Sequence, residues 1–133
     1  VVRLAVESFV DGVLTEGFAS RRLEDGAATI DDRWAGALRS IARDEADHAK
    51  LAADIVAWCH DRSPTLVGAA LLGCARHVPH DPPQRHDHHR YDPTQLEAVG
   101  MVAAQPSAAI WQSTRTDAVV WLGELLGTEG WRA

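Results

Sequence analysis

The chain has 133 residues, of which 46% are hydrophobic and 24% charged, and its formal net charge is −6. These proportions are ordinary for one globular domain, and the acidic balance argues against a nucleic-acid surface. No run of about 18 apolar residues is present, which argues against a membrane partner, and no signal peptide is visible. Cys59 and Cys74 form no Cys-x-x-Cys motif and are interpreted as reduced core thiols of a cytoplasmic protein.

The first predicted element is an amphipathic helix over residues 1–24. One face of it carries residues spaced by 4, 3, 4, 3 and 4 positions, namely Val2, Val6, Phe9, Val13, Glu16 and Ser20. Gly12 and Gly17 each weaken a helix by about 1 kcal/mol relative to Ala, so we expect them to allow a neighbouring helix to approach near Glu16. Glu7 lies off the face and is interpreted as solvated or as a support for metal ligands.

A second long helix is predicted over residues 32–60. Glu24-Asp25-Gly26 is the expected turn before it, and Asp31 or Asp32 the expected N-cap. Its predicted buried stripe again alternates steps of 4 and 3, through Trp34, Leu38, Ile41, Glu45, His48, Ala52, Ile55 and Cys59. Such a connection makes the two helices antiparallel neighbours.

Two ionisable side chains, Glu45 and His48, fall on this stripe. A buried carboxylate is costly unless it is paired or bound to a metal. The Glu-x-x-His spacing places carboxylate and imidazole one turn apart on the same face, close enough to bind one ion together. Carboxylate oxygens with one imidazole suit iron or manganese better than an ion that prefers thiolates.

These residues resemble half of a ferritin-like di-iron carboxylate domain. Glu16, followed 29 residues later by Glu45-x-x-His48 on a second helix, looks like the set of one Glu and one Glu-x-x-His that each half of such a domain supplies. The segment AVESFVDGVLTEGFAS looks like the third helix of small bacterial members, and LRSIARDEADHAKLAADIVAWC looks like the fourth. The resemblance covers about residues 1–60 and implies an all-α antiparallel bundle with metal ligands Glu16, Glu45 and His48.

The complete site of this family takes four carboxylates and two histidines from four helices, whereas this chain shows one set. We therefore expect either a missing N-terminal half or a homodimer in which Glu16, Glu45 and His48 occur twice. The fragment is favoured, because the first helix begins without a cap or leader.

The chain is divided into a helix pair, 1–62, and a helical C-terminal arm, 63–133. Ser63-Pro64 is expected to start a short apolar helix, Asp92-Pro93 a second one that closes near Gln105-Pro106, and a last helix is expected over 107–126. Between them, residues 76–92 form a loop rich in His and Pro. Its histidines are His77, His80, His86, His88 and His89, and without a defined ligand spacing they are interpreted as solvated.

The resemblance implies a di-iron or di-manganese site that supports iron oxidation or a related oxidase reaction. The alternative is a non-enzymatic helical structural or interaction module in which Glu45 and His48 form a buried pair and no metal binds. A third interpretation assigns metal binding to the histidine tract. Convergence of Glu16 on Glu45 and His48 would favour the first, because three such groups are hard to explain without an ion.

Overall fold

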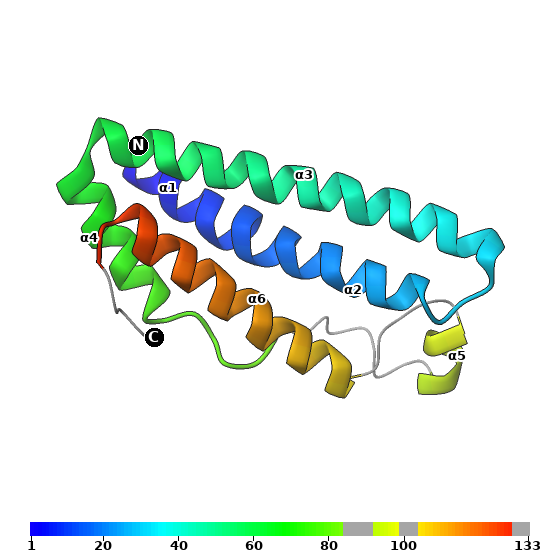
Figure 1. The fold of residues 1–133 in the computed structure, drawn as a ribbon. Coiled ribbons are helices and arrows are strands. Elements are labelled where there is room, and N and C mark those ends of the chain that lie inside the picture. The colour runs from blue at the N-terminus through cyan, green and yellow to red at the C-terminus, as the bar shows by residue number, and fades with distance from the viewer. Residues whose placement is uncertain (84–91, 99–103, 129–133) are drawn as a thin grey trace.

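The described part of the protein is entirely helical. The computed structural model describes residues 1–83, 92–98 and 104–128, and every regular element within these ranges is a helix (Figure 1). The predicted all-α class is thus confirmed for the described ranges. Within them, no helix combines the length and apolar composition that a membrane crossing requires.

The N-terminal arm is one continuous rod built from three helical segments. These are α1 (Val2–Glu7), the π-helix η1 (Ser8–Glu16) and α2 (Gly17–Ala27). The predicted turn at Glu24-Asp25-Gly26 is wrong, because α2 continues to Ala27 and the chain turns over residues 28–31. Gly26 and Ala27 are buried, so this end of α2 stays helical where it packs against its neighbours.

The π-helix η1 explains why the predicted stripe of the first helix is only partly right. The buried apolar positions are Ala5, Phe9, Leu14 and Phe18, whose spacing is 4, 5 and 4 residues. A π-helix bonds each residue to the one five positions back, and this wider turn moves the buried face by one residue. Val13 is accordingly only partly buried, and Leu14 takes its place in the core.

The longest element is α3 (Asp32–Arg62), which lies beside the whole N-terminal rod (Figure 1). Its predicted N-cap is confirmed, since the Asp31 side chain accepts a hydrogen bond from the Arg33 backbone N–H at 2.9 Å. Residue numbers increase along the N-terminal rod in the same direction in which they decrease along α3. Gly12 lies against Ala52, and the Ser20 hydroxyl donates to the Ala42 carbonyl at 2.8 Å.

The predicted buried stripe of α3 is displaced from the observed one. The buried residues are small or medium in size, namely Ala35, Ala42, Ala52, Val56 and Cys59. Of the eight predicted positions only Ala52 and Cys59 are buried, whereas Trp34 and Ile41 are 61% and 46% exposed. The small side chains let α3 pack closely against the rod, so the larger ones lie along the edge of the contact.

The core lies on the far side of the rod, where α4 (Pro64–Ala75) and α6 (Ala104–Leu125) pack. Phe18 of α2 meets Trp111 of α6 edge to face, with ring centroids 5.3 Å apart. The Trp111 indole N–H donates to the Pro79 carbonyl at 3.0 Å, which fixes the segment after α4. This hydrophobic core draws side chains from α1, η1, α2, α3, α4 and α6, on both sides of the predicted division at residue 62.

The predicted boundaries of the later helices are partly right. Helix α4 begins at Pro64 as expected, and α5 (Pro93–Ala98) begins at Pro93. The expected closure at Gln105-Pro106 is wrong, because Pro106 lies in the first turn of α6, where its missing N–H leaves no hydrogen bond unmade. Residues 76–83 contain no regular element, as predicted, while His86, His88 and His89 lie outside the described residues.

Candidate metal centre

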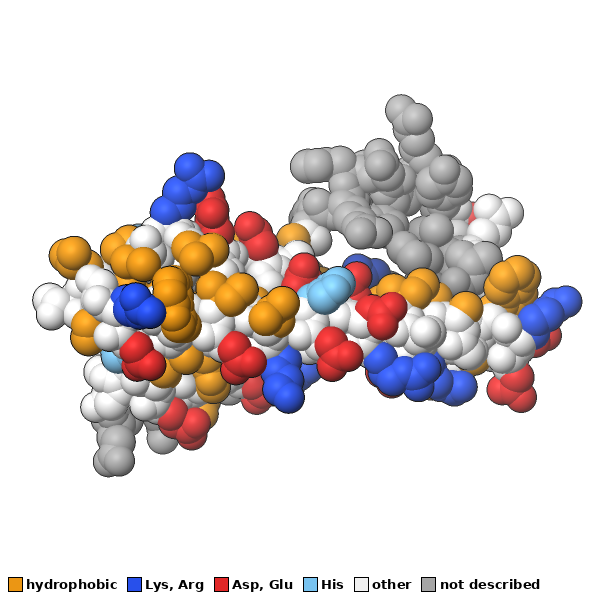
Figure 2. All heavy atoms as spheres, turned by 90° about the horizontal axis from the view of Figure 1, so that it is seen from above, with side chains coloured by type: hydrophobic (Ala, Val, Ile, Leu, Met, Phe, Trp, Pro, Cys, Tyr) orange, Lys and Arg blue, Asp and Glu red, His pale blue; other side chains and the backbone are white. Residues whose placement is uncertain are grey.

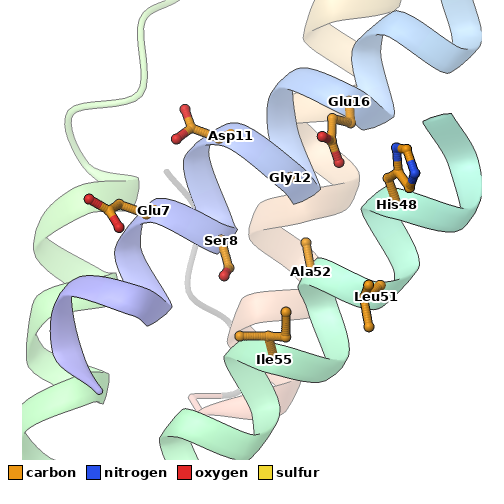
Figure 3. Close-up of a pocket in the computed structure, with 9 residues that line it drawn as sticks. All are labelled: Glu7, Ser8, Asp11, Gly12, Glu16, His48, Leu51, Ala52 and Ile55. Atoms are coloured by element: carbon orange, nitrogen blue, oxygen red, sulfur yellow. The ribbon is translucent and has the colours of Figure 1, made fainter.

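The structure brings together the three side chains that the sequence singled out. Glu16 lies at the end of η1, and Glu45 and His48 lie in the middle of α3. One ligand atom from each residue lies within 4.8 Å of the others. In Figure 3, the Glu16 carboxylate and the His48 ring point toward one another across the gap between η1 and α3. This is the convergence that the metal-binding hypothesis requires.

The cluster lies at the edge of the helix contact and not inside it. Glu16 and Glu45 are half-buried, whereas the His48 side chain is 61% exposed. Glu45 Oε2 and His48 Nδ1 are 4.0 Å apart, at the outer limit of an ion pair. A pair with this exposure contributes little to stability. The buried Glu/His pair that the structural alternative assumes is therefore not what the structure has.

The register of the two helices is set by a very close approach beside the cluster. A Cβ atom placed on Gly12 would lie 2.1 Å from the Ala52 Cβ, so only glycine fits there. The predicted role of Gly12 is confirmed. Gly17 does not share it, because an added Cβ would meet Thr114 and Ala49 at ordinary distances of 3.7 and 3.9 Å.

The π-helix positions Glu16 on the same side of the rod as Gly12. The wider turn of η1 is marked by the Thr15 hydroxyl, which donates to the Val10 carbonyl five residues back at 2.9 Å. Because η1 ends at Glu16, the extra residue of its turns decides where that carboxylate points. The sequence predicted Glu16 as a ligand but not the π-helix that carries it.

An open groove between the rod and α3 extends from the cluster. It has a volume of about 440 Å³ and is lined by Glu7, Ser8, Asp11, Gly12, Glu16, His48, Leu51, Ala52 and Ile55 (Figure 3). Sequence reasoning missed Asp11 and Leu51 as lining residues and interpreted Glu7 as solvated or supporting. Glu7, Asp11 and Glu16 are spaced by 4 and 5 residues, the same steps that mark the π-helix, and this spacing was the available signal.

The pKa shifts of Arg3 and Cys74 bear on which groups could bind a metal. Arg3 binds Glu7 at 2.7 Å, and this hydrogen bond with its attraction raises the pKa of the guanidinium. Glu7 therefore has a cation partner of its own at the far end of the groove. Elsewhere, burial raises the pKa of the Cys74 thiol, which keeps it protonated and makes it a poor metal ligand.

The donor set is chemically suited to a hard or borderline divalent cation. Two carboxylates and one imidazole are the ligands that iron and manganese accept, and the solvent-exposed side of the groove leaves room for further ligands. Asp44 and Asp47, also on α3, are exposed and stand outside the cluster. The chain matches no family model, no curated protein and no solved structure.

Proposed function

We propose that this protein binds iron, or manganese, through Glu16, Glu45 and His48, and that the site is one half of a ferritin-like di-iron carboxylate centre. The observation that supports this most strongly is the convergence of the three ligand atoms within 4.8 Å from two helices. Chance explains an isolated Glu-x-x-His motif readily. It explains less well a second carboxylate, Glu16, which is 29 residues away in sequence and yet lies beside both residues of the motif.

Each residue has a separate role in this proposal. Glu45 and His48, one helical turn apart, bind the same ion from α3, and Glu16 reaches it from η1. The two half-buried carboxylates supply the negative charge that holds the cation, and neutral His48 binds through one ring nitrogen. When bound, the metal supplies one-electron redox chemistry, which suits oxidation of ferrous iron or a related oxidase reaction. The groove beside the cluster gives small molecules access to the ion.

A complete centre of this class needs a second set of ligands. Either a second copy of the chain or a segment that precedes residue 1 supplies them in this proposal, and both routes form an antiparallel four-helix bundle. Three protein ligands alone leave an open site, so we expect a single copy to bind iron weakly.

The decisive experiment is a metal titration of Glu45→Gln against the parent chain. Glutamine keeps the shape of the side chain and removes the charge that a cation requires. We expect binding of Mn²⁺, followed by calorimetry, and of Fe²⁺ under anaerobic conditions to weaken by at least about tenfold. Circular dichroism should show an unchanged helix content, because Glu45 makes no contact that α3 needs for folding.

Asp47→Asn is the matched control. It removes one carboxylate charge from the same helix, two residues away, at an exposed position outside the cluster. Its metal affinity should stay close to that of the parent chain. If both variants bind metal as the parent does, the three residues are not the site. Retained binding in Glu45→Gln together with loss after removal of His77 and His80 would assign the metal to the histidine tract.

A second candidate is an interaction module without metal. The observation that favours it is the number of large apolar side chains left exposed on α3, among them Trp34, Leu51 and Trp58. This candidate predicts association that does not respond to divalent cations. The titration above separates the two candidates, because an interaction module without a metal site predicts that Glu45→Gln leaves the affinity for Mn²⁺ unchanged.

A further inference from the structure

In the described part of the structure, helix α3 carries a second stripe of large apolar residues that are mostly exposed, although Ile55 in this stripe is half-buried and packs against the core. Positions at heptad spacing place Trp34, Ile41, His48 and Ile55 in one row, and Leu51 and Trp58 in the adjacent row. Trp34, Ile41, Leu51 and Trp58 are 61%, 46%, 58% and 47% exposed. A row of large apolar residues with this exposure is unusual in an isolated domain and marks an interaction surface. We call these six residues the open seam.

The cluster of Glu16, Glu45 and His48 lies at the middle of the open seam. Ile41 precedes His48 by seven residues and Ile55 follows it by seven, which is about 10 Å along the helix in each direction. Figure 2 shows this side of the molecule, with an imidazole among carboxylates near the centre and hydrophobic side chains gathered to both sides of it. The apolar parts of the seam therefore flank a polar centre.

The two ends of the seam resemble one another. At the first end the Arg33 guanidinium lies 5.6 Å from the centre of the Trp34 ring, and at the other end Arg62 lies 4.8 Å from the Trp58 ring. Each end thus offers an exposed indole with an arginine over it. Because the seam looks alike from both ends, it is complementary to itself when a second copy of α3 lies across it in the opposite direction.

We propose that a second copy of this chain covers the open seam, related by a two-fold axis that passes beside Glu45 and His48. The inference rests on the proposed function and names the partner that completes the site. The axis brings Ile41 of one copy against Ile55 of the other. It places the end of the seam that carries Trp34 near the end of the other copy's seam that carries Trp58. It also doubles the ligand set to four carboxylates and two imidazoles around one centre, enough for two ions.

Size and charge favour this partner. A helix of 31 residues is about 46 Å long, and with α1 and η1 beside it the face is about 20 Å wide. This area is sufficient for the roughly 800 Å² per partner of a standard interface. Arg33 and Asp61, both exposed, lie at opposite ends of the same flank of α3, so a reversed second copy places each near its opposite charge.

The centre of the interface makes dimerisation depend on metal. Carboxylates from Glu16, Asp44, Glu45 and Asp47 crowd there, and among nearby cations α3 offers Arg43 and Lys50. Two copies double this charge, and like charges repel across an interface. Bound divalent cations offset the repulsion, so the dimer should form with metal and weaken without it.

The test is sedimentation of the whole chain with Mn²⁺, with anaerobic Fe²⁺, and with chelator. We expect a dimer holding about one ion per chain in the presence of metal, and a shift toward monomer in chelator. Ile41→Lys places a charge in the open seam without touching the ligands and should leave a monomer with weakened metal binding. Val120→Lys is the matched control, because Val120 is 53% exposed on α6, away from the seam, and this variant should dimerise as the parent does.

The outcomes separate this inference from the proposed function. A chain that stays monomeric with metal, yet binds Mn²⁺ through Glu45, overturns the second copy as occupant and leaves the face to a segment before residue 1 or to another protein. A dimer that Ile41→Lys breaks, but that takes up no metal, keeps the interface and overturns the metal site. A dimer that survives Ile41→Lys but not Val120→Lys assigns the interface to α6 and contradicts the inference.

Discussion

The two faces of α3 reverse the usual relation between side-chain size and burial. On the face packed against the N-terminal rod, the buried residues are Ala35, Ala42, Ala52, Val56 and Cys59. On the open seam the residues are larger and, apart from the half-buried Ile55, exposed, with Trp34 and Trp58 at its two ends. In most domains the large apolar side chains supply the core. Here α3 uses its small residues inside and leaves its large ones outside.

The difference in side-chain size indicates a separate role for each face of α3. Small residues allow helix axes to approach closely, and at Gly12 and Ala52 the approach is so close that one more carbon atom would not fit. That closeness brings Glu16 to Glu45 and His48. The large residues contribute little to the isolated chain, since they bury only part of their area. In the proposed dimer they bury that area against a second copy of the chain, which also completes the proposed metal site.

The largest expected effect comes from comparing two leucines on opposite sides of the molecule. Leu122 is 0% exposed in the core beneath the rod, while Leu51 is 58% exposed on the open seam. Leu122→Ala should lower the free energy of unfolding by about 2–5 kcal/mol. Leu51→Ala should change it by no more than about 0.5 kcal/mol. Urea denaturation of the metal-free monomer measures both, and equal losses would mean that the seam is covered within one copy.

A second comparison sharpens the view of the closed face. Gly12→Ala places a Cβ 2.1 Å from that of Ala52, so the helices must separate, at a cost of about 1–3 kcal/mol. Gly36→Ala is the control, because nothing lies within 4 Å of the added Cβ on this exposed part of α3. It should stabilise the helix by up to about 1 kcal/mol. Thermal unfolding should move in opposite directions for the two, and a harmless Gly12→Ala would contradict the observed register.

The sequence was sufficient to predict the helical class, the N-cap at Asp31 and the three residues of the cluster. These depend on local rules, since a capping side chain acts within three residues and Glu-x-x-His is fixed by the helix itself. The meeting of Glu16 with the motif needed more than periodicity. It was expected from a resemblance and is now seen in the geometry, whereas metal binding at these residues is a proposal.

The parts that escaped prediction depend on packing between elements. A 3.6-residue repeat has no place for the five-residue step between Phe9 and Leu14, so the buried face of the rod was displaced by one position. Periodicity also gives one apolar arc for α3 and does not say which part of it a neighbour will cover. The N-terminal rod packs against the alanine face of α3, because Gly12 lets it approach Ala52 closely. Trp34 and Ile41 therefore lie at the surface.

The smallest expected effect concerns the boundary between the two faces, where the cluster lies. Glu45→Gln in the metal-free chain should leave the free energy of unfolding within about 1 kcal/mol of the parent or raise it, because among the described residues it removes only the long, partly exposed ion pair with His48. Removing one of two neighbouring carboxylates also relieves repulsion with Glu16. A loss of about 3–5 kcal/mol would instead indicate a buried ion pair. Urea denaturation in chelator decides between these values, and with Mn²⁺ added only the parent should gain stability, because a ligand stabilises the folded state that binds it.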